Sequence, residues 1–175
     1  MIWSSYSHDI FVFFKSTDIY DGVVLHAEDD RDAAIEFIKN MERENPDLNI
    51  TLYDNLTPGT SLLGRAAELF ASCRYLFVFV THNFVKADLE MFLSEIATNA
   101  TLTLKGNKDR LIPVLTDRTC RVATLTPVQP LKYYHYLEAK EKQQDPDYYF
   151  IKCFTKVIDD GRQKYLKKNC KLIWY

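Results

Sequence analysis

The sequence lacks both a strong net charge and a long apolar run. Its 175 residues carry a formal charge of -2, which leaves no basic field to attract nucleic acid or an anionic membrane surface. The apolar runs at 10–14 and 75–80 are far too short to span a bilayer, and the N-terminus has no secretory signal pattern. We therefore expect a cytoplasmic protein with no nucleic acid partner and no direct membrane insertion.

Cysteine and glycine are also scarce. Cys73, Cys120, Cys153 and Cys170 form no Cys-x-x-Cys pair and have no histidine at ligand spacing, so neither a metal site nor a disulfide framework is expected. None of the five glycines belongs to a glycine-rich turn after a strand, which excludes dinucleotide-binding and P-loop sites. The residues alone therefore predict no metal and no cofactor.

What is present is an alternation of short apolar runs with amphipathic segments. We expect strands at 20–26, 48–53, 75–81 and 111–115 and a weaker one near 131–136, and helices at about 33–45, 62–72, 85–100 and 148–166. The run at 75–81 is unbroken and apolar, which is typical of a strand covered on both faces. The alternation predicts an α/β, flavodoxin-like three-layer fold, with a five-stranded parallel sheet and helices on both faces.

The two ends do not join this pattern. Residues 1–18 are an extension that is compatible with an edge strand, a packed helix or a flexible segment. Residues 19–166 form the expected domain. The tail at 167–175 mixes lysines with apolar residues and is compatible with a frayed or a docked end.

In parallel sheets ligands usually lie outside the carboxyl ends of the strands. Glu28, Asp29 and Asp30 follow the first predicted strand, where the simplest role for them is to complement the dipole of the next helix. A phosphoacceptor receiver domain would need an aspartate after the central strand, but that strand ends at Thr81, and Asp54 ends the second one. The receiver hypothesis is therefore disfavoured.

Motifs in a fixed order carry a family resemblance. The first spans residues 20–30, Tyr-Asp-Gly-Val-Val-Leu-His-Ala-Glu-Asp-Asp, and includes Asp21, His26, Glu28, Asp29 and Asp30. The second, which we call the 54–60 loop, follows Tyr53 and consists of Asp54, Asn55, Leu56, Thr57, Pro58, Gly59 and Thr60. Ala67-Glu68-Leu69, Cys73-Arg74 and the strand into Thr81 follow, and Tyr149-Phe150 takes the place of an aromatic third motif. Together they resemble Toll/interleukin-1 receptor (TIR) domains over about residues 19–165.

The resemblance implies a signalling adaptor in Toll-like receptor innate immunity. Parts of the chain are similar to the myeloid differentiation primary-response adaptor and others to the TRIF/TRAM adaptors. Partners would be the TIR domains of receptors and other adaptors, with a homo-oligomer or filament as a further expectation. The contact surface would be the 54–60 loop, in which Pro58 and Gly59 favour a tight, preset turn. Asp54-Asn55 stands where the family commonly has Arg-Asp.

The resemblance also leaves an enzymatic alternative open. Some TIR domains cleave NAD⁺ with a glutamate on the helix after the central strand, and Glu95 takes a similar place here. Under this alternative Glu95 would be catalytic and NAD⁺ would be the substrate. Under the adaptor hypothesis no catalytic residue and no cofactor are expected.

Overall fold

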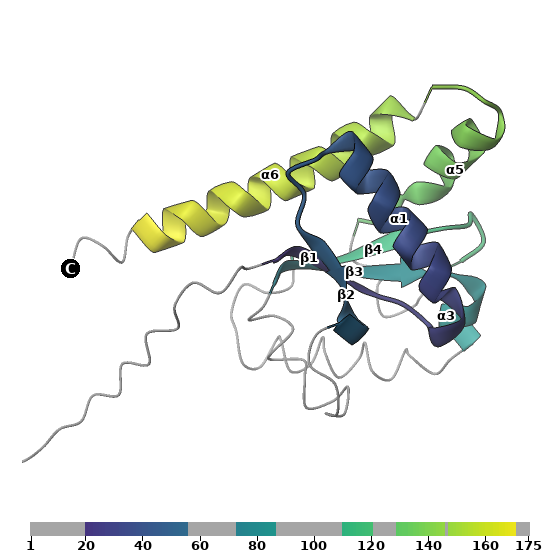
Figure 1. Cartoon of the computed structure of the whole chain (residues 1–175), viewed down its shortest axis with the longest axis horizontal. Helices are drawn as coiled ribbons and strands as arrows, with labels where there is room; N and C mark the ends of the chain where they lie inside the picture. Colours follow the sequence, from purple (N-terminus) through teal and green to yellow (C-terminus); the bar gives the residue numbers. More distant parts are fainter. Residues whose placement is uncertain (1–19, 56–72, 87–109, 121–128, 146, 171–175) are drawn as a thin grey trace, which may run out of the picture.

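The computed structural model of the protein describes residues 20–55, 73–86, 110–120, 129–145 and 147–170, with side chains described as far as residue 164. Five strands form one parallel sheet in the order β2-β1-β3-β4-β5 (Figure 1). Their bounds are β1 Tyr20–Leu25, β2 Ile50–Leu52, β3 Cys73–Val80, β4 Leu111–Leu115 and β5 Leu131–Lys132. The predicted flavodoxin-like α/β fold is confirmed, including the central place of the longest apolar strand.

The described helices are α1 Arg31–Glu44, α3 His82–Lys86, α5 Tyr133–Glu141 and α6 Tyr148–Cys170, and 3-10 turns occupy Glu28–Asp30 and Tyr53–Asn55. Figure 1 shows α1, α5 and α6 gathered on the same side of the sheet. None of the described helices combines the length and the apolar character that crossing a membrane requires.

Several predicted bounds change. The strand expected at 131–136 is wrong beyond Lys132, because α5 begins at Tyr133. Helix α3 begins three residues before the predicted start at 85, and α6 continues past the predicted end at 166. The helix predicted at 62–72, most of the one at 85–100, and segments 1–18 and 171–175 lie outside the described residues.

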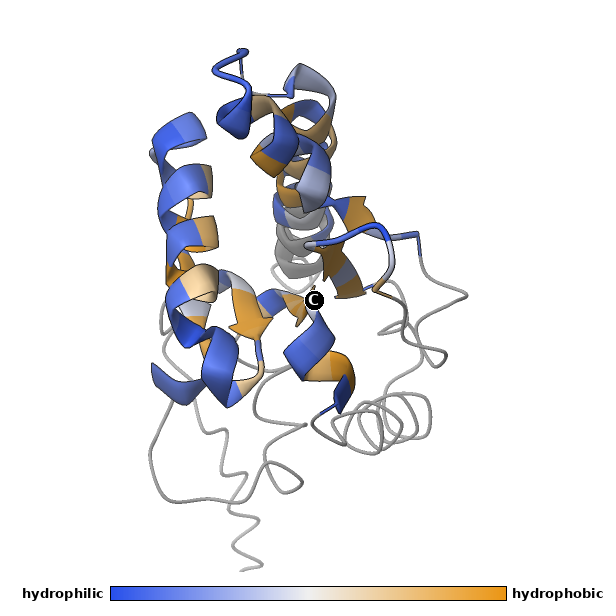
Figure 2. Ribbon diagram, turned by 90° about the vertical axis from the view of Figure 1, so that its right-hand side faces the viewer, coloured by the Kyte–Doolittle hydropathy of each residue, from blue (hydrophilic) through white to orange (hydrophobic). Residues whose placement is uncertain are grey.

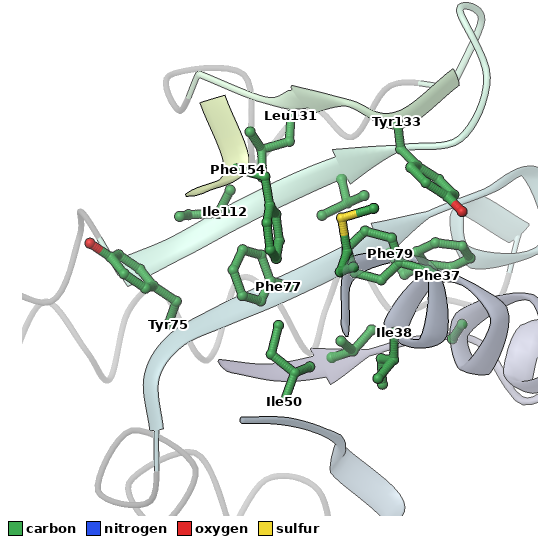
Figure 3. Close-up of a cluster of buried hydrophobic side chains, with 14 of the residues drawn as sticks. Phe37, Ile38, Ile50, Tyr75, Phe77, Phe79, Ile112, Leu131, Tyr133 and Phe154 are labelled. Atoms are coloured by element: carbon green, nitrogen blue, oxygen red, sulfur yellow. The ribbon is translucent and has the colours of Figure 1, made fainter. Parts of the chain in front are cut away.

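The larger core lies between the sheet and the helices α1, α5 and α6. Figure 3 shows aromatic rings from β3 and from these helices meeting there. Phe37 of α1 packs edge-on against Tyr133 at 4.9 Å between ring centroids, and Phe154 of α6 stacks on Phe77 at 5.6 Å. Helix α1 is amphipathic, with its apolar residues toward this core and polar ones outside (Figure 2). Burial of these rings is the main force that holds the helices on this face.

The opposite face of the sheet carries a second buried cluster. Alternate residues of the two central strands supply it, among them Val23 and Leu25 of β1 and Leu76 and Val78 of β3, and Phe84 of α3 packs against them. Because successive strand residues point to opposite faces, the apolar run at 75–80 of β3 contributes to both clusters at once.

Asp21 joins three elements at the amino edge of the sheet. Its side chain is 2% exposed and accepts hydrogen bonds from Arg74 at 2.5 Å, from Arg162 of α6 at 2.5 and 3.0 Å, and from the Asn49 backbone at 3.2 Å. Burial alone would raise the pKa of Asp21, but the Arg162 and Asn49 hydrogen bonds and the two arginine charges outweigh it, so the pKa is lowered. The residue is thus an ionised tie between β1, β3 and α6.

Candidate functional site

The carboxyl edge of the sheet gathers polar side chains from segments far apart in the sequence. His26 follows β1, Asp54 lies in the turn after β2, and Thr81 follows β3. In parallel sheets these strand ends meet at one edge, so the fold places the start of the 54–60 loop beside the first motif.

Asp54 is held in place by two neighbours. Arg31 Nε, in the first turn of α1, donates a 2.9 Å hydrogen bond to Asp54 Oδ2, and His26 Nε2 lies 3.7 Å from Asp54 Oδ1. Burial acts to raise the pKa of Asp54, but the Arg31 hydrogen bond and the charges of His26 and Arg31 lower it overall. The Asp54 side chain is still 32% exposed. The residue that opens the loop is therefore an anchored, ionised acid that also reaches the surface.

His26 forms the buried support of Asp54. Its side chain is 2% exposed, and its ring packs 5.2 Å from the ring of Tyr53. Its Nδ1 lies 2.7 Å from the carbonyl oxygen of Ala27; since a carbonyl can only accept, Nδ1 carries the proton and donates. Its Nε2 faces Asp54 and has no hydrogen-bond partner among the described residues. These contacts indicate that His26 positions Asp54 from inside the domain.

Asp30 connects the first motif to the end of the central strand. Its side chain accepts hydrogen bonds from the Thr81 hydroxyl and, at 2.8 Å, from Asn83 Nδ2. The Thr81 oxygen in turn accepts the Phe84 backbone N–H at 2.9 Å, which caps α3. Asp30 makes no side-chain cap bond to α1. Its main contacts are thus to α3 rather than to its own helix, whereas Glu28 is exposed in the turn.

Of the remaining predicted residues, Asp21, Tyr149 and Phe150 are not part of this polar group, whereas Asp29 and Asn55 directly neighbour Glu28 and Asp54. Asp21 lies at the amino edge, and Phe150 is buried at 3% exposure among the core rings while Tyr149 is 70% exposed on α6. Asp29 is exposed beside Glu28, and Asn55 Nδ2 donates to Thr51 Oγ1 at 3.2 Å. Leu56, Thr57, Pro58, Gly59, Thr60 and Glu95 lie outside the described residues.

Sequence reasoning missed the partners of these groups. Arg31 was not singled out, although a basic residue in the first turn of a helix beside an acidic strand end is a readable signal. Thr81 was recognised only as the end of the central strand, and neither it nor Asn83 was expected to bond to Asp30, which is 51 and 53 residues away. Such pairs become visible only when the strand order is known.

Comparison with known proteins supports the fold. No protein-family model matches the chain, and no curated protein does either. Among solved structures, the crystal structure of the TIR domain of the Toll-related receptor TRR-2 from the lower metazoan Hydra magnipapillata matches with a TM-score of 0.54 and 16% sequence identity. The match covers 80% of this chain and 98% of the other. At this identity the likeness shows that the chain has the fold of a TIR domain.

Proposed function

We propose that the chain is a TIR domain that acts as a signalling adaptor in Toll-like receptor innate immunity. It would bind the TIR domains of receptors and other adaptors, and further copies of itself, through the 54–60 loop. The fold shared with a receptor TIR domain supports the class of protein. The anchoring of Asp54 between Arg31 and His26 is the observation that points to the loop.

Anchoring bears on affinity because a loop that is already ordered loses less entropy when it binds. Ordering an interface side chain on binding costs about 0.5–1.5 kcal/mol. The hydrogen bond from Arg31 and the buried ring of His26 fix the first residue of the loop in advance, and Pro58 restricts the backbone further along. The ordering penalty on binding is therefore reduced at Asp54, and the proline in the sequence favours a small penalty further along the loop.

The test is concentration-dependent self-association, together with binding to a panel of immobilised receptor TIR domains. We expect Pro58→His to weaken both at least tenfold, because it removes the backbone restraint at the loop. The matched control is Pro46→His, an identical change at an exposed turn between α1 and β2, at the other edge of the sheet. If Pro58→His binds and associates as the wild type does, the loop is not the interface.

The enzymatic alternative makes a different prediction. An adaptor leaves NAD⁺ intact at high protein concentration, whereas a TIR hydrolase consumes it and loses this activity in Glu95→Ala. Glu95 lies outside the described residues, so its choice as the catalytic residue comes from the sequence resemblance. Turnover that depends on Glu95, together with unchanged binding by Pro58→His, would favour the enzyme over the adaptor.

A further inference from the structure

A second polar cluster lies on the carboxyl edge, where β3 and β4 end. His82 is the first residue of α3, and Asp117 and Cys120 lie in the segment that follows β4. One ring nitrogen, one carboxylate oxygen and the cysteine sulfur lie within 4.8 Å of one another. Among the described residues this is the group in which three such ligand types converge.

The geometry does not fit nucleophilic catalysis. In a relay triad the acid and the nucleophile bind opposite nitrogens of the histidine. Here Asp117 Oδ1 at 3.8 Å and Thr119 Oγ1 at 3.3 Å both face His82 Nε2. Cys120 is 2% exposed, which leaves a substrate little access to its sulfur. Three ligand atoms of different types within 4.8 Å of one another are close enough to share a cation.

We propose that His82, Asp117 and Cys120 form a zinc-binding site. Zn²⁺ is bound by thiolate at about 2.3 Å and by imidazole or carboxylate at about 2.0–2.2 Å. For atoms no more than 4.8 Å apart, a point exists within about 2.8 Å of all three, so an inward shift of under about 1 Å per ligand completes the site.

Two of the three proposed ligands are exposed enough to shift. The His82 and Asp117 side chains are 64% and 50% exposed, which leaves them room to move and leaves a fourth position open to water. Thr119 orients the carboxylate, because its backbone N–H and its hydroxyl both donate to Asp117 Oδ1, at 2.7 and 2.5 Å. Outer hydrogen bonds of this kind tune metal affinity.

The ligand types select the metal. A thiolate with an imidazole suits Zn²⁺, whereas Mg²⁺ and Ca²⁺ take oxygen ligands. On binding, the Cys120 sulfur gives its proton to solvent and donates an electron pair to the ion, with no change of oxidation state. The bound ion would join the start of α3 to the segment after β4, independently of any contact made by the 54–60 loop.

The test uses the full chain, stripped of metal with a chelator and titrated with Zn²⁺ against a chromophoric competitor. We expect one equivalent to bind, with His82→Ala and Asp117→Asn each lowering the affinity at least tenfold. His135→Ala and Cys153→Ser are matched controls outside the cluster, and they should bind as the wild type does. His82→Ala changes an exposed side chain, so it is informative even if a change at the buried cysteine impairs folding.

Cobalt provides a direct readout of the sulfur ligand. Substitution of Co²⁺ should give a thiolate-to-metal charge-transfer band in the near ultraviolet that Cys120→Ser removes and Cys153→Ser retains. The proposal is overturned if the wild type binds no stoichiometric zinc, if His82→Ala binds as tightly as the wild type, or if the band depends on Cys153. None of these outcomes depends on TIR binding, so the zinc site and the adaptor function can fail separately.

Discussion

Gly22 offers the sharpest test of the packing between the two central strands. A Cβ atom at this position would lie 2.3 Å from Cε2 and 2.6 Å from Cδ2 of Phe77, where ordinary contacts begin at 3.4 Å. Phe77 is fully buried and stacks on Phe154 at 5.6 Å. The ring would have to shift by about 1 Å in a core that is close-packed. Gly22→Ala therefore forces strain on the sheet face that carries the larger core.

Overpacking of this kind costs about 1–3 kcal/mol. We expect a cost in the upper part of that range, because the Phe77 ring is not the flexible end of a side chain and cannot easily move aside. Alanine offsets roughly 0.5–1 kcal/mol of this cost, because it lowers the conformational entropy of the unfolded chain. The net loss in the free energy of unfolding is then about 2 kcal/mol, which corresponds to a fall in Tm of about 4–8 °C for a domain of this size.

Urea unfolding followed by circular dichroism measures the loss, and an unchanged m-value shows that it reflects stability. Gly161→Ala is the matched control: its Cβ would lie 2.3 Å from the Tyr75 ring, but the helix gains about 1 kcal/mol from alanine. We expect a smaller loss there. A Phe77→Leu change should also cost less in the Gly22→Ala background than in the wild type. A Gly22→Ala stability within about 0.5 kcal/mol of the wild type would refute the packing argument.

Three further substitutions test side chains with polar groups in the described part of the chain. Asp21→Asn should lower the free energy of unfolding by about 2 kcal/mol at neutral pH, which is below the range for fully buried ion pairs because Arg162 is partly exposed. Since folding lowers the pKa of Asp21, the difference between variant and wild type should shrink as the pH falls through the pKa of Asp21 in the folded state. Burial raises the pKa of Tyr133 to about 12. The neutral Tyr133 phenol should therefore contribute fully to the free energy of unfolding below about pH 10, and this contribution should be lost as the pH rises to 12. Tyr133→Phe should flatten this alkaline decline in urea titrations. Arg31→Ala should change stability by less than about 1 kcal/mol, because its side chain is 48% exposed, yet it should weaken TIR binding by releasing Asp54.

The fold was readable where one physical signal dominated. The apolar run of β3 fits a strand buried on both faces, and the apolar stripe of α1 fits a helix that packs one face against a core. The error at Tyr133 arose because tyrosines favour strands locally. Leu131, Tyr133 and Tyr136 are all buried in the same core, and the spacing of the last two is that of one helix face, so tertiary packing outweighed local preference.

The candidate site was less readable because its contacts join residues far apart in the chain. Local sequence indicated that acids follow the first strand, but the partners of Asp30 come from the segment after β3. The proposed zinc ligands form no local sequence motif for the same reason, since His82 and Cys120 follow two different strands. Short-range ligand spacing is a property of sites built on one turn or helix, and this cluster is built on the pairing of β3 with β4.

The central claim is that the 54–60 loop forms the protein contact. Hydrogen–deuterium exchange of the chain, alone and in complex with a TIR domain of a receptor or of a second copy, tests it most directly. We expect peptides covering Tyr53 through the loop to gain the strongest protection on binding, while the amino edge around Asp21 exchanges as before. Protection confined to the amino edge, with none in the loop, would show that the loop is not the contact surface.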